Sequence, residues 1–513
     1  MISSRYDELL AVPSLRDWIP PDALQFLGTL IDAAHARRDQ AGAERAIALA
    51  SDLSIDDWTS LQRAVYSYYM SNAWADLRNR KAKTLDDRWE WVSPEFERSL
   101  IFLRNAWNES AFQQLPNEIQ SQILTNLGNQ VSTIGRYIEA FEFWDAALEA
   151  TPSFPMALAN RGYGRFLYGR DQYDTGHKEL FLRAAFRDLA ESCDRIPYPD
   201  AQEFFTSLRL SIARAFPPGS LEHEVKLREF RLGRSKTEIA YRSWALKHRL
   251  FLNPMNDLVE ESVAAADVLL TPGIVAPTSE PPLLLGFFSQ IKQEYTSARY
   301  LLYEGIHRRV PRYADRDVKL WNTFDYPSYG TNVEFVKLSY RTLFSIFDKV
   351  AFFLNRYFDL QIRENRVNFR SLWHESERTD KSLKPVFRRQ PNLPLRGLYW
   401  ISRDLDASGD RSLRTDADEL RVMRNHLEHK YLKVHEPEWV LAKGDPLRTD
   451  SLAYSIDRAV LEQRALRLAK TARAAIIYLG LAVRTEEEYR RERRGGADVP
   501  GIRLDIYDDR WKT

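Results

Sequence analysis

The chain has 513 residues, 44% of them hydrophobic and 28% charged, which is the composition of an ordinary globular protein of two or three domains. Lys and Arg number 73 against 72 Asp and Glu, which excludes an overall basic charge, so any nucleic-acid-binding surface must be local. The single cysteine, Cys193, excludes a disulfide within the chain and a cysteine-cluster zinc site. The first residues lack a signal-peptide pattern and no apolar run is long enough to span a membrane, so we expect a cytoplasmic protein without a membrane partner.

Apolar residues recur with the period of an α-helix throughout residues 1–255. The clearest repeat combines Gly128, Ala140, Trp144 and Pro152 at the spacing of a tetratricopeptide helix pair, in which small residues allow close packing and proline ends the second helix. One pair cannot bury its own apolar face, so about three or more pairs should stack into a curved array. An irregular helical bundle is the alternative.

Residues 256–330 are predicted to form a helical connector, with a helix over 289–304 and an aromatic, turn-rich stretch over 311–330. A long, unusually apolar helix is predicted over 331–360. Such a helix is covered on most sides, either in a bundle core or in an oligomer interface. One polar stripe interrupts its apolar surface at helical spacing, formed by Lys337, Arg341, Ser345, Asp348 and Asn355.

Residues 361–413 are predicted to be rich in loops. The part from 361 to 400 carries nine Lys or Arg against four acids, with aromatic residues interleaved. Cations that meet phosphates and rings that stack on bases suit single-stranded nucleic acid, so the candidate RNA-binding residues are Arg370, Trp373, Lys384, Arg388 and Arg389. A solvated loop with a few buried aromatic anchors is the alternative. His374 and its acidic neighbours have no further clustered ligands, so we expect no metal site.

The next predicted helix covers residues 416–436 and ends before Pro437. Its core-facing stripe consists of Leu420, Met423, Leu427, Tyr431 and Val434. Asn425 and His429 lie on nearly the opposite face, and Arg424 is roughly 140° around the helix from His429. An ordinary charged surface is the alternative, because Arg424 and Glu428 form an i,i+4 pair. A last long helix is predicted over 455–491, and residues 502–507 could form one short strand.

The run Arg424-Asn425-His426-Leu427-Glu428-His429 resembles the Arg-Asn-x-x-x-His signature of HEPN-superfamily ribonucleases. Asp348 fits that family's habit of placing a polar residue opposite the motif. The blocks 252–257 and 292–300 also resemble bacterial proteins that pair tetratricopeptide-like repeats with a HEPN domain. The expected fold is therefore all-α, with a repeat array over 1–255, a connector over 256–330, a HEPN-like helical bundle over 331–485 and a tail over 486–513.

The resemblance implies an endoribonuclease that uses no metal or other cofactor and acts in bacterial anti-phage defence or in a toxin–antitoxin type of system. The 2′-hydroxyl of the RNA would attack the adjacent phosphodiester, with His429 in acid–base catalysis, Arg424 on the phosphate, Asn425 in positioning and Asp348 in orienting the site. In this superfamily the motif normally comes from two subunits, so a homodimer is expected, with a protein or peptide regulator on the array. The alternative is a non-catalytic scaffold whose HEPN-like domain dimerises or binds nucleic acid.

Overall fold

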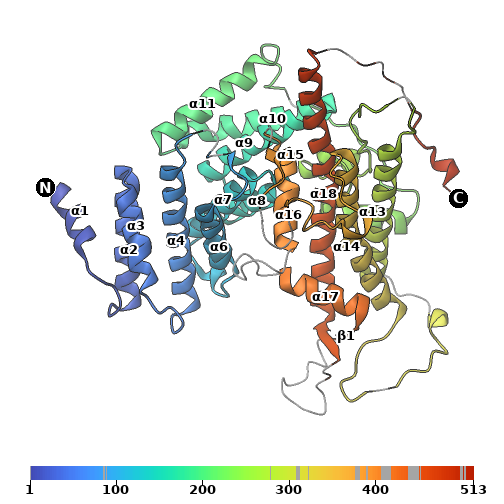
Figure 1. Ribbon diagram of the computed structural model, residues 1–513, viewed down its shortest axis with the longest axis horizontal. Coiled ribbons are helices and arrows are strands. Elements are labelled where there is room, and N and C mark those ends of the chain that lie inside the picture. The colour runs from blue at the N-terminus through green and yellow to red at the C-terminus, as the bar shows by residue number, and fades with distance from the viewer. Residues whose placement is uncertain are drawn as a thin grey trace.

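The computed structural model describes residues 2–512 except 85, 86, 88, 224, 278, 308–311, 322, 376–381, 389–390, 406–416, 437–449, 451, 497–498, 500 and 502–503, and gives the backbone alone for 2–4, 312 and 417–421. Helices dominate these residues, which confirms the predicted all-α class (Figure 1). In the described part of the chain, no helix is both long and apolar enough to cross a membrane.

The N-terminal part consists largely of stacked helix pairs. The helices are α1 (Ile2–Ala11), α2 (Pro20–Arg37), α3 (Gln40–Ser51), α4 (Ser60–Lys81), α6 (Pro94–Asn108), α7 (Asn117–Thr133), α8 (Tyr137–Ala150), α9 (Pro155–Asp171), α10 (Thr175–Ser192), α11 (Pro199–Arg214) and α12 (Lys236–Lys247). Helix α2 packs on α3, α4 on α6, α7 on α8 and α9 on α10, and each pair contacts the next. The pairs stack as the repeat spacing predicted, while the tetratricopeptide assignment itself stays a prediction.

The pair α7 and α8 is built around one glycine–tryptophan contact. A Cβ atom placed on Gly128 would lie 2.5 Å from Nε1 of Trp144, so only glycine lets the two helices approach this closely. The Trp144 ring is buried and its Nε1 donates to Asn129 at 3.0 Å. Gly135 forms the turn between the helices with a φ of +84°, a conformation that side chains disfavour. The small residues of the predicted repeat therefore do the packing expected of them.

The C-terminal part is a bundle around one long helix. Its helices are α13 (Leu283–His307), α14 (Thr331–Tyr357), α15 (Pro385–Arg388), α16 (Leu393–Leu405), α17 (Ala417–His429) and α18 (Arg458–Arg493). Helix α18 packs against α13, α14 and α16 (Figure 1). Short 3-10 turns complete the described structure at Phe112–Gln114, Cys193–Arg195, Pro254–Asp257, Ser262–Ala264, Arg312–Ala314, Glu364–Arg366 and Asp509–Trp511.

Two predictions for this region were wrong. The motif helix ends at His429 rather than 436, and Tyr431–His435 forms strand β1, which pairs in parallel with β2 (Ala453–Asp457) in the register Tyr431 to Ala453. The start of the predicted last helix is therefore a strand, and α18 begins at Arg458. Pairing between β1 and β2 explains both errors. A parallel partner strand lies too far along the chain to be predicted from a local sequence pattern. In the tail, residues 504–507 form no strand, and 502–503 lie outside the described residues.

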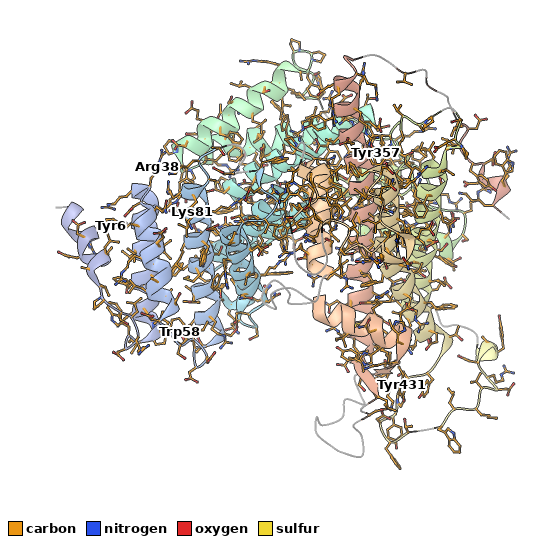
Figure 2. All side chains as sticks on the ribbon, in the orientation of Figure 1. Tyr6, Arg38, Trp58, Lys81, Tyr357 and Tyr431 are labelled. Atoms are coloured by element: carbon orange, nitrogen blue, oxygen red, sulfur yellow. The ribbon has the colours of Figure 1, made fainter. Side chains whose placement is uncertain are left out.

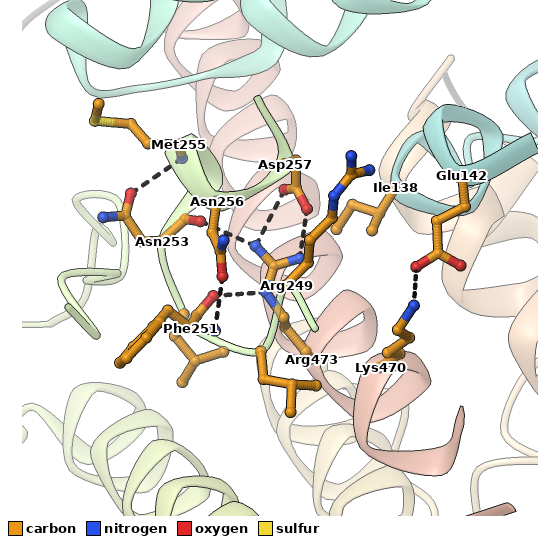
Figure 3. Close-up of polar contacts among 12 residues, drawn as sticks. Ile138, Glu142, Arg249, Phe251, Asn253, Met255, Asn256, Asp257, Lys470 and Arg473 are labelled. Atoms are coloured by element: carbon orange, nitrogen blue, oxygen red, sulfur yellow. Dashed lines mark hydrogen bonds and ion pairs between the residues drawn. The ribbon is translucent and has the colours of Figure 1, made fainter. Parts of the chain in front are cut away.

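From α4 onward, the repeat array shares a large hydrophobic core with the C-terminal bundle, and this core runs through buried residues from Ala64 to Val483. Helices α1 to α4 build a second cluster between Tyr6 and Ala73, and α9 to α11 a third between Ala159 and Ile212. Polar contacts cross the same boundary. The Asp404 carboxylate on α16 accepts from Arg104 at 2.9 Å and also pairs with Arg136, and both arginines belong to the array. Arg473 on α18 is buried with Asp257 (Figure 3). The divisions drawn from sequence at 255 and 330 therefore do not separate independent cores.

Candidate functional site

The motif helix α17 is fixed against α14 and α16. Met423 is fully buried and Leu427 is 4% exposed, so this part of the predicted apolar stripe is the face that packs inward. Arg341 on α14 donates to the Leu427 carbonyl, a group that the end of a helix otherwise leaves without a partner. Tyr431 and Val434, predicted to continue the stripe, belong to β1, and Tyr431 is 40% exposed. The α14 stripe thus holds the C-terminal end of α17 in place.

Asp348, Arg424 and Asn425 line one small pocket of about 200 Å³, together with Asn368 and Arg370 among other residues. The sequence predicted that Asp348 faces the motif, and the fold brings the two helices together at this point.

Two contacts fix the walls of the pocket. The Arg424 guanidinium lies over the Phe344 ring, 5.1 Å from its centroid, a contact that holds the cation in place without neutralising its charge. Asp348 accepts a long hydrogen bond of 3.4 Å from the Phe369 backbone N–H. The pocket is therefore lined by one carboxylate, two amides and two guanidinium groups.

His429 does not reach this pocket. It is exposed at the last residue of α17, and it makes no hydrogen bond or ion pair to another described residue. Five residues along a helix turn the side chain by roughly 140° and advance it by about 7.5 Å, so Arg424 and His429 diverge. The neighbouring His426 is tied down: its Nδ1 lies 2.7 Å from the Val422 carbonyl and its ring lies against Tyr454. A single chain thus presents the two halves of the motif in different directions.

Residues 275–486 match the family model described as LA2681-like HEPN. The C-terminal domain is a HEPN domain. The match begins before residue 331 and takes in α13, which packs along α14 as an integral helix of the bundle. No curated protein and no solved structure matches the chain.

The five candidate RNA-binding residues of the HEPN domain have different surroundings. Arg370 is exposed and lines the same pocket as Arg424, and Arg388 is exposed on α15. The Lys384 ammonium group donates a hydrogen bond to the His374 carbonyl, so at least one of its three donors is already used within the chain. Arg389 lies outside the described residues.

The prediction for Trp373 was wrong, because its ring is fully buried and its Nε1 donates to the Phe369 carbonyl at 2.8 Å. Its packing partners Phe387 and Tyr399 are buried as well. These aromatic residues of the basic segment are therefore buried anchors of a loop. This was the alternative to RNA binding that the composition of the segment left open. Rings inside the core cannot stack on RNA bases.

Sequence reasoning missed two residues that shape the site. Phe344, on the helix that was predicted to be covered on most sides, is half-buried and holds the Arg424 guanidinium over its ring. Asn368 lines the pocket from a loop, and no spacing rule links a loop residue to a helix so far along the chain. For Phe344 a signal existed, because it lies one helical turn before Asp348. Within the described residues, no three His, Cys, Asp or Glu side chains gather as a metal-binding group.

Proposed function

We propose that the HEPN domain is a metal-independent endoribonuclease whose active site combines α17 helices from two copies of the chain. The observation that carries this proposal is the division of the motif. Arg424 and Asn425 line a pocket with Asp348, whereas His429 of the same helix is exposed and points elsewhere. A second copy that covers the exposed side of α17 supplies the missing histidine to each pocket.

The residues fit cleavage by the RNA's own 2′-hydroxyl. The 2′ oxygen attacks the adjacent phosphorus and loses its proton to a base, and the bond from phosphorus to the 5′ oxygen breaks. That oxygen takes up a proton, which leaves a 2′,3′-cyclic phosphate and a free 5′-hydroxyl. His429 serves the proton transfers because imidazole titrates near neutral pH. Arg424 stabilises the charge that develops on the phosphate, and Asn425 and Asp348 position the groups around it.

The biological setting of the proposal is a bacterial defence or toxin–antitoxin type of system, in which the helical array senses a protein or peptide regulator. Support comes from the way the array is joined to the HEPN domain. Asp404 on α16 is held by two array arginines, and Tyr478 on α18 donates to Glu139 of the array at 2.6 Å. A regulator that moved the array would therefore act directly on helices α16 and α18, which pack in the same bundle as α17.

The test compares RNA cleavage by the purified wild type with that by His429→Ala and Arg424→Ala, in buffer containing EDTA. Wild type should cleave and both variants should not. His426→Gln is a matched control, because Arg421 and His426 repeat the Arg-to-His spacing on the same helix, and this variant should keep cleaving. Growth arrest on expression, relieved by the same two substitutions, gives a second readout should the purified protein be held inactive by its array. If wild type and the two variants behave alike in both assays, the non-catalytic scaffold is the correct function.

A further inference from the structure

The segment between α13 and α14 exposes far more apolar surface than a connecting loop needs. We call residues 313–321 and 323–329 the aromatic arm. Trp321 is 91% exposed, Phe324 is 74% and Tyr313 is 75%, and the aliphatic Val318 and Leu320 are also more than half exposed. Figure 1 shows the arm as the yellow loop at the end of the molecule where α17 and β1 lie. Large apolar side chains gathered on one segment mark an interaction surface.

The arm is held in place by buried polar contacts. The Lys433 ammonium group on β1 donates to Asp325 at 2.6 Å and pairs with Asp450 at 3.0 Å. Both side chains of the Lys433–Asp325 pair are less than a tenth exposed. Burial raises the pKa of Asp325, but the hydrogen bonds that its carboxylate accepts, chiefly from Lys433, and the charge of Lys433 together outweigh burial and lower that pKa, so the pair stays charged. Ser328 N–H also donates to the Val434 carbonyl at 2.7 Å. The exposed rings Trp321 and Phe324 therefore lie just before the part of the arm that is anchored to β1.

The anchor ties the arm to the candidate site. Strand β1 begins two residues after His429, and Lys433 lies four residues after it. An extended chain spans at most about 3.6 Å per residue, so the anchor lies within roughly 15 Å of His429. Tyr431, labelled at the lower end of the molecule in Figure 2, is 40% exposed on the same strand, and Leu452 just before β2 is 73% exposed. Apolar surface thus continues from the arm onto the sheet beside α17.

The chemistry of the arm favours a protein partner over RNA. Val318 and Leu320 offer no flat face for a base, and Asp317 lies between the cations Arg316 and Lys319, so the arm carries no surplus positive charge for phosphates. A mixed-charge, aromatic surface is what protein interfaces use for their central contacts. In a two-fold dimer each contact occurs twice, so an arm that docks on the second copy would receive the arm of that copy on its own equivalent surface.

We propose, on the basis of the composite site described above, that the aromatic arm docks on the β1–β2 surface of a second copy of this chain and so brings His429 of one copy to the Arg424 pocket of the other. Trp321 and Phe324 are its anchors, and exposed Tyr431 and Leu452 receive them. Dimerisation and completion of the active site are then one event.

The experiment measures the mass of the full-length protein by light scattering over a dilution series, for wild type, Trp321→Ser with Phe324→Ser, and Trp511→Ser. Trp511 is a matched control, since it is 58% exposed in the C-terminal tail. Wild type and the control should be dimers. The double arm variant should have a dimer dissociation constant at least about thirty-fold higher, as expected when interface anchors are removed. Circular dichroism checks that the variant is folded, which is expected because the substituted rings are exposed.

Three results would overturn the inference: a wild type that is monomeric at all concentrations, an arm variant that dimerises like wild type, or an arm variant that stays dimeric and loses affinity for RNA. The last result is measured in the His429→Ala background, where RNA is bound but not cut, and would assign the arm to RNA instead. Because the mass readout does not depend on catalysis, failure of the arm is distinct from failure of the proposed nuclease. A dimeric wild type that cleaves no RNA, and that arrests growth no more than its His429→Ala variant does, would refute the nuclease and leave the arm intact.

Discussion

Arg473 is the residue whose loss should most weaken the connection between the array and the HEPN domain. Its guanidinium donates to Asp257 at 2.6 Å, to the Asn253 carbonyl at 2.9 Å and to the Phe251 carbonyl at 2.5 Å (Figure 3). Arg473 and Asp257 are each 1% exposed at the side chain. Burial lowers the pKa of Arg473, but the charge of Asp257, its hydrogen bond with Arg473 and the nearby tyrosines together outweigh burial and raise that pKa, so the pair is ionic. The residues 251–257 thus close around a cation that α18 supplies.

The substitution Arg473→Met keeps most of the side-chain volume and removes the charge. It leaves the Asp257 carboxylate buried with the Tyr168 hydroxyl, at 3.0 Å, and without its cation. Breaking one partner of a buried pair in this way costs about 3–5 kcal/mol. Lys470→Met is the matched control on the same helix, because the Lys470–Glu142 pair is about one-third exposed and is worth about 0–1 kcal/mol.

Urea unfolding followed by circular dichroism measures both costs. The residues around Arg473 and Asp257 belong to the core cluster that the array and the HEPN domain share, so both costs are measured on the transition in which this cluster unfolds. Arg473→Met should lower the free energy of unfolding by about 3–5 kcal/mol and Lys470→Met by less than about 1 kcal/mol. Adding Asp257→Asn to Arg473→Met should recover part of the loss, since the unpaired carboxylate is then neutral. An Arg473→Met protein within about 1 kcal/mol of wild type would refute the reasoning.

Two further predictions concern the packing and the charges of the fold. Gly128→Ala should destabilise by about 1–3 kcal/mol, because its Cβ would lie 2.5 Å from Trp144 Nε1, whereas Gly286→Ala on α13, with nothing within 4 Å of its Cβ, should leave the urea midpoint unchanged or higher. Burial raises the pKa of Asp404, but the charges of Arg104 and Arg136 outweigh it and hold that pKa far below its usual value. The stability that Asp404 contributes is therefore present above the ordinary carboxyl pKa of about 4 and is lost as pH falls towards the lowered one. The difference in unfolding free energy between wild type and Asp404→Asn should be equal at pH 7 and pH 5 and smaller at pH 3; a difference that already shrinks at pH 5 would contradict this.

Local periodicity predicted the helices well, because each helix carries its own apolar stripe whatever it packs against. The stripe of Met423 and Leu427 is buried as predicted, and Asp348 lines one pocket with Arg424, while its role in orienting the site stays a prediction. Long-range pairing was beyond the same reasoning. Strand β1 depends on a partner that begins at Ala453, and the buried state of Trp373 depends on neighbours from several segments. The Lys433 anchor was missed for the same reason, since its acids lie on distant loops.

The composite site is tested most directly by mixing two inactive variants. Arg424→Ala and His429→Ala each remove one half of the motif. In a mixed dimer, one site combines the intact Arg424 of one copy with the intact His429 of the other, and the second site lacks both. With equal amounts and random pairing, half of the dimers are mixed and each has one working site, so RNA cleavage should return to about a quarter of the wild-type rate. A mixture as inactive as its two components, when both variants are shown to exchange subunits, would contradict the composite site.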